Sequence, residues 1–165
     1  MPTIDYVNYI KQPVATTNRV FLTNWAQPGF GATSGAIDAN DALGDPFAWS
    51  VPRYGMISSV SLIDIDDDTL AATVHIFNRP FTAAASDAAF TIALLSDVQN
   101  WVTSQVMGTP LDIGAGKVVT NSGLFIYYEA PLGQLYSQLS STGTPTIAGA
   151  ATMPFIRLAI LPLGI

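Results

Sequence analysis

The chain has 165 residues, of which 49% are hydrophobic and 11% are charged, and this composition excludes a disordered chain and predicts one folded domain. It contains no cysteine, which excludes disulfides and thiolate-bound metals. Six basic side chains stand against twelve acidic ones, and the net charge of −6 argues against nucleic acid as a partner, because such binding needs a basic surface.

The first part of the chain is predicted to be an extended arm. Residues 1–17 mix apolar and polar side chains without a sustained period and include Pro2 and Pro13. No basic leader precedes an apolar stretch, so no secretory signal is expected, and no apolar run is long enough to span a bilayer. A single domain is expected over residues 18–165.

The residue types of that domain favour strands over helices. Eleven of the twelve acids are Asp and only two residues are Lys, so the usual formers of solvent-facing helices are nearly missing. Thr, Ser, Val, Ile and aromatic residues dominate, and 13 glycines and 11 prolines separate them. This is typical of short strands joined by tight turns.

The first half of the domain predicts a strand from Asn18 to Trp25, then an irregular loop at about 26–48, rich in Gly, Ala, Asp and Pro. Alternating residues predict strands over 56–64 and 72–78, which we expect to pair as a hairpin around the turn DIDDDT. The residues expected to face the core are Val60, Leu62, Val74 and Ile76, while positions 57, 59, 61 and 63 share the opposite face.

The second half predicts a helical turn or loop over 83–89, a strand over 90–95 and a helical turn near 97–101. Further strands are expected over 102–107, 117–120, 124–129, 134–139 and 155–161. Turn signals about every eight to twelve residues predict an all-β fold, an antiparallel β-sandwich closed as a jelly roll or Greek key.

One acidic cluster invites a calcium interpretation, because carboxylates on a tight loop can converge on a hard cation. The candidate ligands are Asp64, Asp66 and Asp68. An EF-hand loop starting at Asp64 needs Gly at its sixth position and Glu at its twelfth, where this chain has Thr69 and His75. A solvated turn is therefore the favoured interpretation, and no metal is expected.

Motifs for catalysis fail their spacing tests. His75 is the sole histidine, and no nucleophile elbow G-x-S-x-G accompanies it, since GATSG at 31–35 has its serine one place late. The run GAGK ending at Lys117 lacks the earlier Gly and the following Ser or Thr of a phosphate loop. We expect no enzyme and no cofactor, although a carboxylate pair for glycoside hydrolysis stays open.

Aromatic residues offer an alternative, a carbohydrate-binding β-sandwich module that uses surface aromatics. The set is Trp25, Trp49, Trp101, Tyr127 and Tyr128. The two tyrosines point to opposite faces of one strand, so at most one of them lies on any platform. Core packing is the favoured role for the set.

From Met56 to Leu161 the chain shows a strand ending in Leu-Ile-Asp, a strand ending in Phe-Asn-x-Pro-Phe, an Ala/Asp-rich connection, Leu-Tyr followed by Thr-Pro-Thr, and a final strand with Leu-x-Ile-Leu. In this order the stretch resembles the jelly-roll cement (decoration) proteins of tailed-bacteriophage capsids. The resemblance covers about two thirds of the chain and leaves out the first 50 or so residues.

The resemblance implies a structural virion protein that is made in the host cytoplasm and binds the outer face of the capsid. It would stabilise contacts between subunits of the major capsid protein, as a symmetric homo-oligomer, dimer or trimer, without nucleic acid or membrane. Capsid contact is expected in the arm and in the 26–48 loop, where extended segments can wrap a partner. The residues chosen there are Tyr6, Tyr9, Pro28, Phe30 and Phe47.

Overall fold

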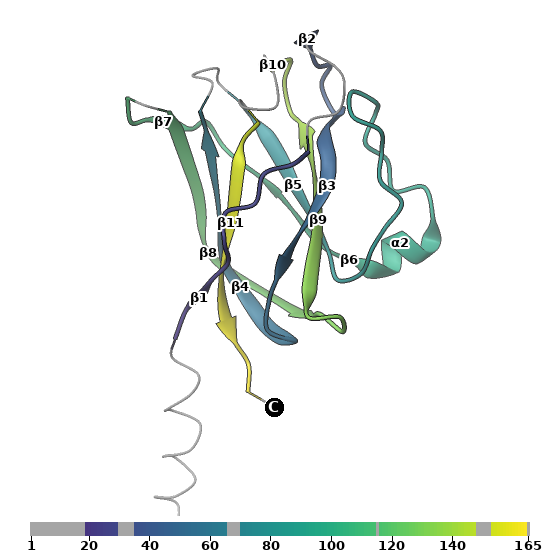
Figure 1. Ribbon diagram of the computed structural model, residues 1–165, viewed down its shortest axis with the longest axis vertical. Helices are drawn as coiled ribbons and strands as arrows, with labels where there is room; N and C mark the ends of the chain where they lie inside the picture. Colours follow the sequence, from purple (N-terminus) through teal and green to yellow (C-terminus); the bar gives the residue numbers. More distant parts are fainter. Residues whose placement is uncertain (1–18, 30–34, 66–69, 115, 148–152, 165) are drawn as a thin grey trace, which may run out of the picture.

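The computed structural model describes residues 19–29, 35–65, 70–114, 116–147 and 153–164, and it places two antiparallel sheets face to face (Figure 1). One sheet has five strands, in the order β1 (Phe21–Leu22), β11 (Phe155–Pro162), β4 (Tyr54–Asp64), β8 (Lys117–Glu129) and β7 (Leu111–Asp112). The other has four, in the order β3 (Ala42–Ser50), β9 (Gln134–Ser141), β5 (Ala72–Phe77) and β6 (Trp101–Val106). The predicted all-β sandwich is confirmed.

The pairing of the eight main strands is nested from the ends of the chain inward. β1 pairs with β11, β3 with β9, β4 with β8, and β5 with β6, all antiparallel. A long hairpin rolled up on itself gives this order, with alternate pairs falling into opposite sheets, and it is the jelly-roll topology. Two further strands of two residues each, β2 (Gly35–Ala36) and β10 (Thr146–Ile147), pair with each other apart from both sheets. No helix among the described residues is long and apolar enough to cross a membrane.

The core lies between the sheets, where the alternation of each strand places it. Val60 and Leu62 of β4 and Val74 and Ile76 of β5 are completely buried, as predicted. Removing a side chain of this size from water stabilises the fold by roughly 1.5–3 kcal/mol. These facing pairs therefore hold the two sheets together.

A bulge in β4 changes which residues share the buried face. Alternation predicts that Ile57 and Val60 lie on opposite faces of the strand, but both are completely buried on the same face. The reason is that the pairing with β8 shifts between Ile57 and Ser59. The hydroxyl of Ser58 donates to the carbonyl oxygen of Ala159 at 3.0 Å, and the register with β11 shifts at the same point, because Ser59 and Ile57 pair with the consecutive residues Ala159 and Ile160. The extra residue reverses the alternation and adds an apolar side chain to the core.

The prediction of an irregular loop over 26–48 is wrong for its second half, because β3 runs from Ala42 to Ser50 and pairs with β9. Its alternation is broken by Gly44 and Pro46, and the register with β9 shifts between Leu43 and Phe47. A strand that contains a bulge and a proline at a sheet edge has no clean period to detect.

The predicted hairpin between 56–64 and 72–78 is also wrong. β4 and β5 match those ranges, but they lie in opposite sheets, so the connection between them crosses the sandwich. Alternation defines the buried face of each strand and leaves its partner undefined.

Three other elements differ in extent. The expected strand at Asn18–Trp25 is reduced to Phe21–Leu22, and the strands expected over 117–120 and 124–129 form one strand, β8. The segment 90–94 is not a strand, whereas the predicted helical turn corresponds to α2 (Leu95–Asn100).

The segment 78–100, which includes α2, covers the outer face of the four-stranded sheet (Figure 1). Gln138 of β9 is completely buried and holds it: its amide nitrogen donates to the carbonyl oxygens of Ala84 and Gly44 at 2.7 and 3.1 Å, and its oxygen accepts from the Ala84 N–H at 3.1 Å. Phe81 stacks on Phe77 with ring centroids 3.9 Å apart. This face of the sandwich is thus closed by the chain itself.

The buried tyrosine of β8 leads to a stability prediction. The hydroxyl of Tyr128 has no hydrogen bond to the described residues, and a Cβ atom on Gly55 would lie only 2.6 Å from it. Burial raises the pKa of Tyr128 well above its usual range. Because a buried unpaired hydroxyl is destabilising, Tyr128→Phe should raise the free energy of unfolding by about 1 kcal/mol in urea denaturation. The adjacent, exposed Tyr127→Phe is the control and should change nothing; a loss of stability in Tyr128→Phe would mean that the hydroxyl is paired.

Candidate functional site

The acidic cluster lies at the end of β4. Asp64 is buried, and one of its carboxylate oxygens accepts the backbone N–H of Leu70 at 3.4 Å. Asp66 and Asp68 lie outside the described residues. Within the described ranges, no group of three or more His, Asp or Glu side chains is placed to hold a metal ion. Of the three candidate ligands the structure places only Asp64, and its hydrogen bond to Leu70 joins the end of β4 to the residues that lead into β5.

His75 lies at the centre of a polar cluster between the four-stranded sheet and its cover. Its Nδ1 atom is 2.7 Å from the hydroxyl of Ser104, and its Nε2 atom is 2.9 Å from that of Ser140. The ring of Phe90 stacks on the imidazole with centroids 3.8 Å apart. Both hydroxyls are bonded to the same covered imidazole, and the indole N–H of Trp101 also donates to Ser104 at 3.1 Å. A neutral imidazole satisfies both contacts, since it donates at one nitrogen and accepts at the other.

Burial lowers the pKa of His75 to about 4, from 6.5 in an unfolded chain. Between these two pH values the unfolded chain binds the extra proton, so stability is complete above pH 6.5 and falls as the pH is lowered toward 4. We expect the free energy of unfolding to fall by roughly 2 kcal/mol between neutral pH and about pH 5. His75→Gln should lack this part of the loss when urea denaturation is measured across the range; equal pH dependence in both proteins would contradict the assignment.

The structure describes two of the five residues predicted to contact the capsid. Tyr6, Tyr9 and Phe30 lie outside the described residues. Pro28 is buried, and Phe47 is half-buried, with its ring edge-on to Trp49 at a centroid distance of 4.9 Å. The two residues that the structure places therefore offer little surface to a partner.

The aromatic set does not form one platform. Trp49 and Tyr128 are buried, as expected for core packing, whereas Tyr127 is 69% exposed on the opposite face of β8 from its neighbour. Trp101 begins β6 in the other sheet, and Trp25 lies beside β11 with the guanidinium of Arg157 4.3 Å from its ring centroid. The prediction that the two tyrosines point to opposite faces is confirmed.

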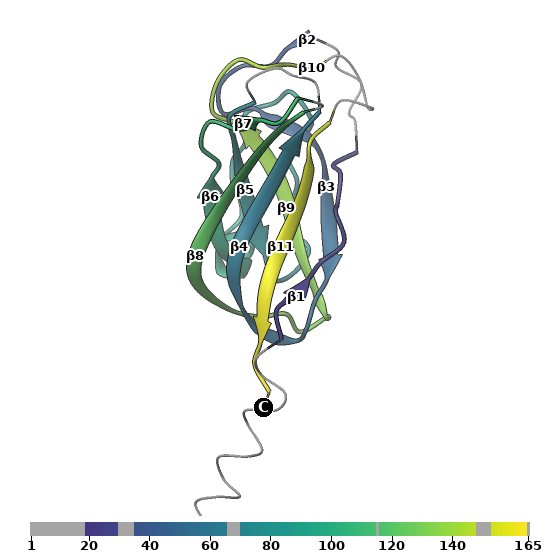
Figure 2. The same ribbon diagram turned by 90° about the vertical axis from the view of Figure 1, so that its left-hand side faces the viewer.

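The outer face of the five-stranded sheet is open to solvent where β8, β4 and β11 lie side by side (Figure 2). Tyr127 is opposite Met56, which is in turn opposite Leu161, and all three alternate with buried neighbours, so they form a row across the face. Phe125, two residues before Tyr127 on β8, is 74% exposed. We call Met56, Phe125, Tyr127 and Leu161 the open-face cluster. Met56 and Leu161 are half-buried beside the two exposed rings, and we treat this apolar surface as the candidate interaction site.

Sequence reasoning missed this cluster although a signal was present. The stretch from Leu124 to Tyr128 is apolar at five successive positions, so both faces of the strand are hydrophobic. Such a strand is either covered on both sides or exposes an apolar face. Here Ile126 and Tyr128 face the core, and Phe125 and Tyr127 face solvent.

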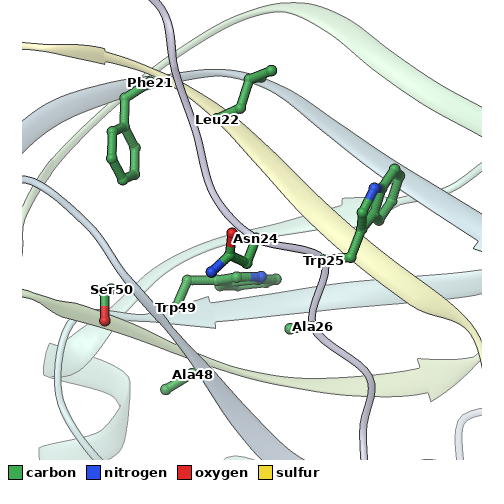
Figure 3. Close-up of a pocket in the computed structure, with 8 residues that line it drawn as sticks. All are labelled: Phe21, Leu22, Asn24, Trp25, Ala26, Ala48, Trp49 and Ser50. Carbon is green, nitrogen blue, oxygen red and sulfur yellow. The ribbon is translucent and has the colours of Figure 1, made fainter.

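A pocket of about 420 Å³ opens between β1 and β3, which are edge strands of the two sheets (Figure 3). Its described lining is Phe21, Leu22, Asn24, Trp25, Ala26, Ala48, Trp49 and Ser50. The side chain of Asn24 points toward the indole of Trp49. None of these residues is charged.

Comparison of the chain with protein-family models, with curated proteins and with solved structures gives no match. Functional inference therefore depends on the open-face cluster, on the pocket and on the chemistry of their residues.

Proposed function

We propose that this protein is a structural virion protein, a cement protein that binds the outer surface of a tailed-phage capsid and stabilises contacts between major capsid subunits. The observation that carries the proposal is the open-face cluster. The four-stranded sheet is covered by the protein's own segment 78–100, whereas the opposite sheet presents Phe125 and Tyr127 to solvent.

The composition of this surface suits a protein partner. The cluster lies across three adjacent strands, and Ser59, Ser61 and Thr120 continue the same face with hydroxyl groups. The hydroxyl of Thr120 donates to that of Ser61 at 2.9 Å. An apolar centre with a polar surround is the usual composition of a protein interface, and aromatic side chains contribute most of its binding energy.

The polar cluster around His75, between the four-stranded sheet and its cover, supports a structural role. His75 is bonded to two serines and covered by Phe90, and its lowered pKa keeps it neutral at physiological pH. Its contacts stabilise the packing of the cover on the sheet. In this proposal the protein binds the capsid lattice as a symmetric homo-oligomer, through its surface residues and without a cofactor.

Co-sedimentation with undecorated tailed-phage capsids tests the proposal. We expect saturable binding, and a higher melting temperature for the bound protein, because a partner that binds only the folded state must stabilise it. Capsids that already carry a full set of decoration protein are the control and should bind none. Failure to bind undecorated capsids at any concentration would refute the proposed function.

A further inference from the structure

The pocket between β1 and β3 lies at the edge of the core, which contributes Trp49 to its lining, and it shares no residue with the proposed capsid contact. It opens on the side of the sandwich where the edge strands of the two sheets face each other, whereas the open-face cluster lies on the outer face of one sheet. Its volume of about 420 Å³ lies within the range of roughly 300–1,000 Å³ that is typical of small-molecule sites.

Both tryptophans of the pocket have side-chain contacts within the protein. The indole N–H of Trp49 donates to the carbonyl oxygen of Ile156 at 3.4 Å, and this buried ring faces the pocket from β3. The guanidinium of Arg157 lies 4.3 Å from the ring centroid of Trp25 and orients that side chain. A site whose rings are already fixed loses little conformational entropy when a ligand binds.

Two polar side chains at the opening of the pocket can form hydrogen bonds with a ligand. Asn24, two residues after β1, and Ser50, the last residue of β3, are both exposed. Together they supply an amide that donates and accepts and a hydroxyl that does the same. Ala26 and Ala48 leave space beside them. Because the described lining carries no charge, the pocket suits a neutral ligand that has an apolar face and several hydroxyl groups.

We propose that this pocket binds one unit of a neutral carbohydrate, a hexose or an N-acetylhexosamine. The C–H face of the sugar ring contacts Trp25, and its hydroxyls bond to Asn24 and Ser50. The inference does not depend on the capsid function, because the pocket and the open-face cluster have no residue in common.

NMR titration of the full chain tests this inference, because its three tryptophans give three indole N–H signals. Glucose, galactose, mannose and N-acetylglucosamine are each raised to about 100 mM, well above an expected dissociation constant of about 1 mM. We expect at least one sugar to shift the signals of Trp25 and Trp49 saturably. The signal of Trp101, which lies outside the pocket, should stay unchanged.

Two pocket variants and one control complete the test. Asn24→Ala and Trp25→Ala should each weaken the binding at least about tenfold, whereas Trp101→Phe should leave it unchanged. The inference is overturned if none of the four sugars shifts Trp25 and Trp49, or if the Trp101 signal moves to the same extent. It is also overturned if the pocket variants lose capsid binding and the wild-type pocket ignores sugar, which would assign the pocket to a protein partner.

Discussion

Replacing Gly44 with alanine should lower the free energy of unfolding by about 3 kcal/mol or more, the largest loss expected from adding a methyl group to any glycine that the structure describes. Gly44 has a φ of +72°, where a side chain is strained. An added Cβ would also clash with the backbone oxygen of Gly29 and would lie 2.6 Å from the Cε atom of Met153. The backbone of β3 or of its neighbour must move to relieve this contact.

The effect should be large because several segments meet at Gly44. Its N–H donates to the hydroxyl of Ser86 at 3.2 Å, and its carbonyl oxygen accepts from Gln138 at 3.1 Å. A shift at this point therefore disturbs both β3 and the cover of the four-stranded sheet. Thermal unfolding should show a midpoint roughly 10 °C lower.

Gly143→Ala is the matched control for Gly44→Ala. Its added Cβ would meet nothing within 4 Å, and its φ lies outside the positive range. Its stability should stay within about 0.5 kcal/mol of wild type. Equal stability of the two variants would show that the chain around Gly44 is not packed as described.

The double variant Phe125→Ser with Tyr127→Ser should lose capsid binding at least about 100-fold. Both rings are mostly exposed and adjacent on one face of β8, and aromatic residues at the centre of an interface typically contribute about 2 kcal/mol or more each. Since neither ring is part of the core, the variant should unfold at about the same urea concentration as wild type. Co-sedimentation over a range of protein concentrations measures the loss.

Leu95→Ser is the control for the double variant. Leu95 is 73% exposed in α2, on the opposite side of the sandwich, so its replacement removes apolar surface away from the open-face cluster. Its capsid binding should equal that of wild type. If Leu95→Ser reduced binding as much as the double variant, the capsid contact would not lie on the five-stranded sheet.

How far the sequence predicts the fold depends on how regular each strand is. Val60, Leu62, Val74 and Ile76 follow strict alternation, and their burial could be predicted from it. Ile57 could not be assigned in the same way, because the bulge at Ser58 and Ser59 is set by pairing with strands far along the chain. Strand pairing is a tertiary property. The sequence therefore locates β4 and β5 correctly but wrongly predicts that they pair with each other.

The candidate site was less predictable than the fold. Exposed apolar residues such as Phe125 and Tyr127 look like core residues in a sequence, and only the three-dimensional arrangement shows which face of β8 is covered. The pocket is lined by both Asn24, which follows β1, and Ser50, which ends β3, and these two strands are edges of different sheets. Because the sequence predicts a loop over 26–48 in place of most of β3, it does not predict that Asn24 and Ser50 line one pocket.

The central claim is that the open-face cluster is the surface that contacts the capsid, and hydroxyl-radical footprinting of free and capsid-bound protein tests it most directly. Oxidation of Phe125 and Tyr127 should fall sharply on the capsid, while Trp101, which is 45% exposed on the other sheet, should remain reactive as an internal reference. Unchanged oxidation of Phe125 and Tyr127 in capsid-bound protein would contradict the claim.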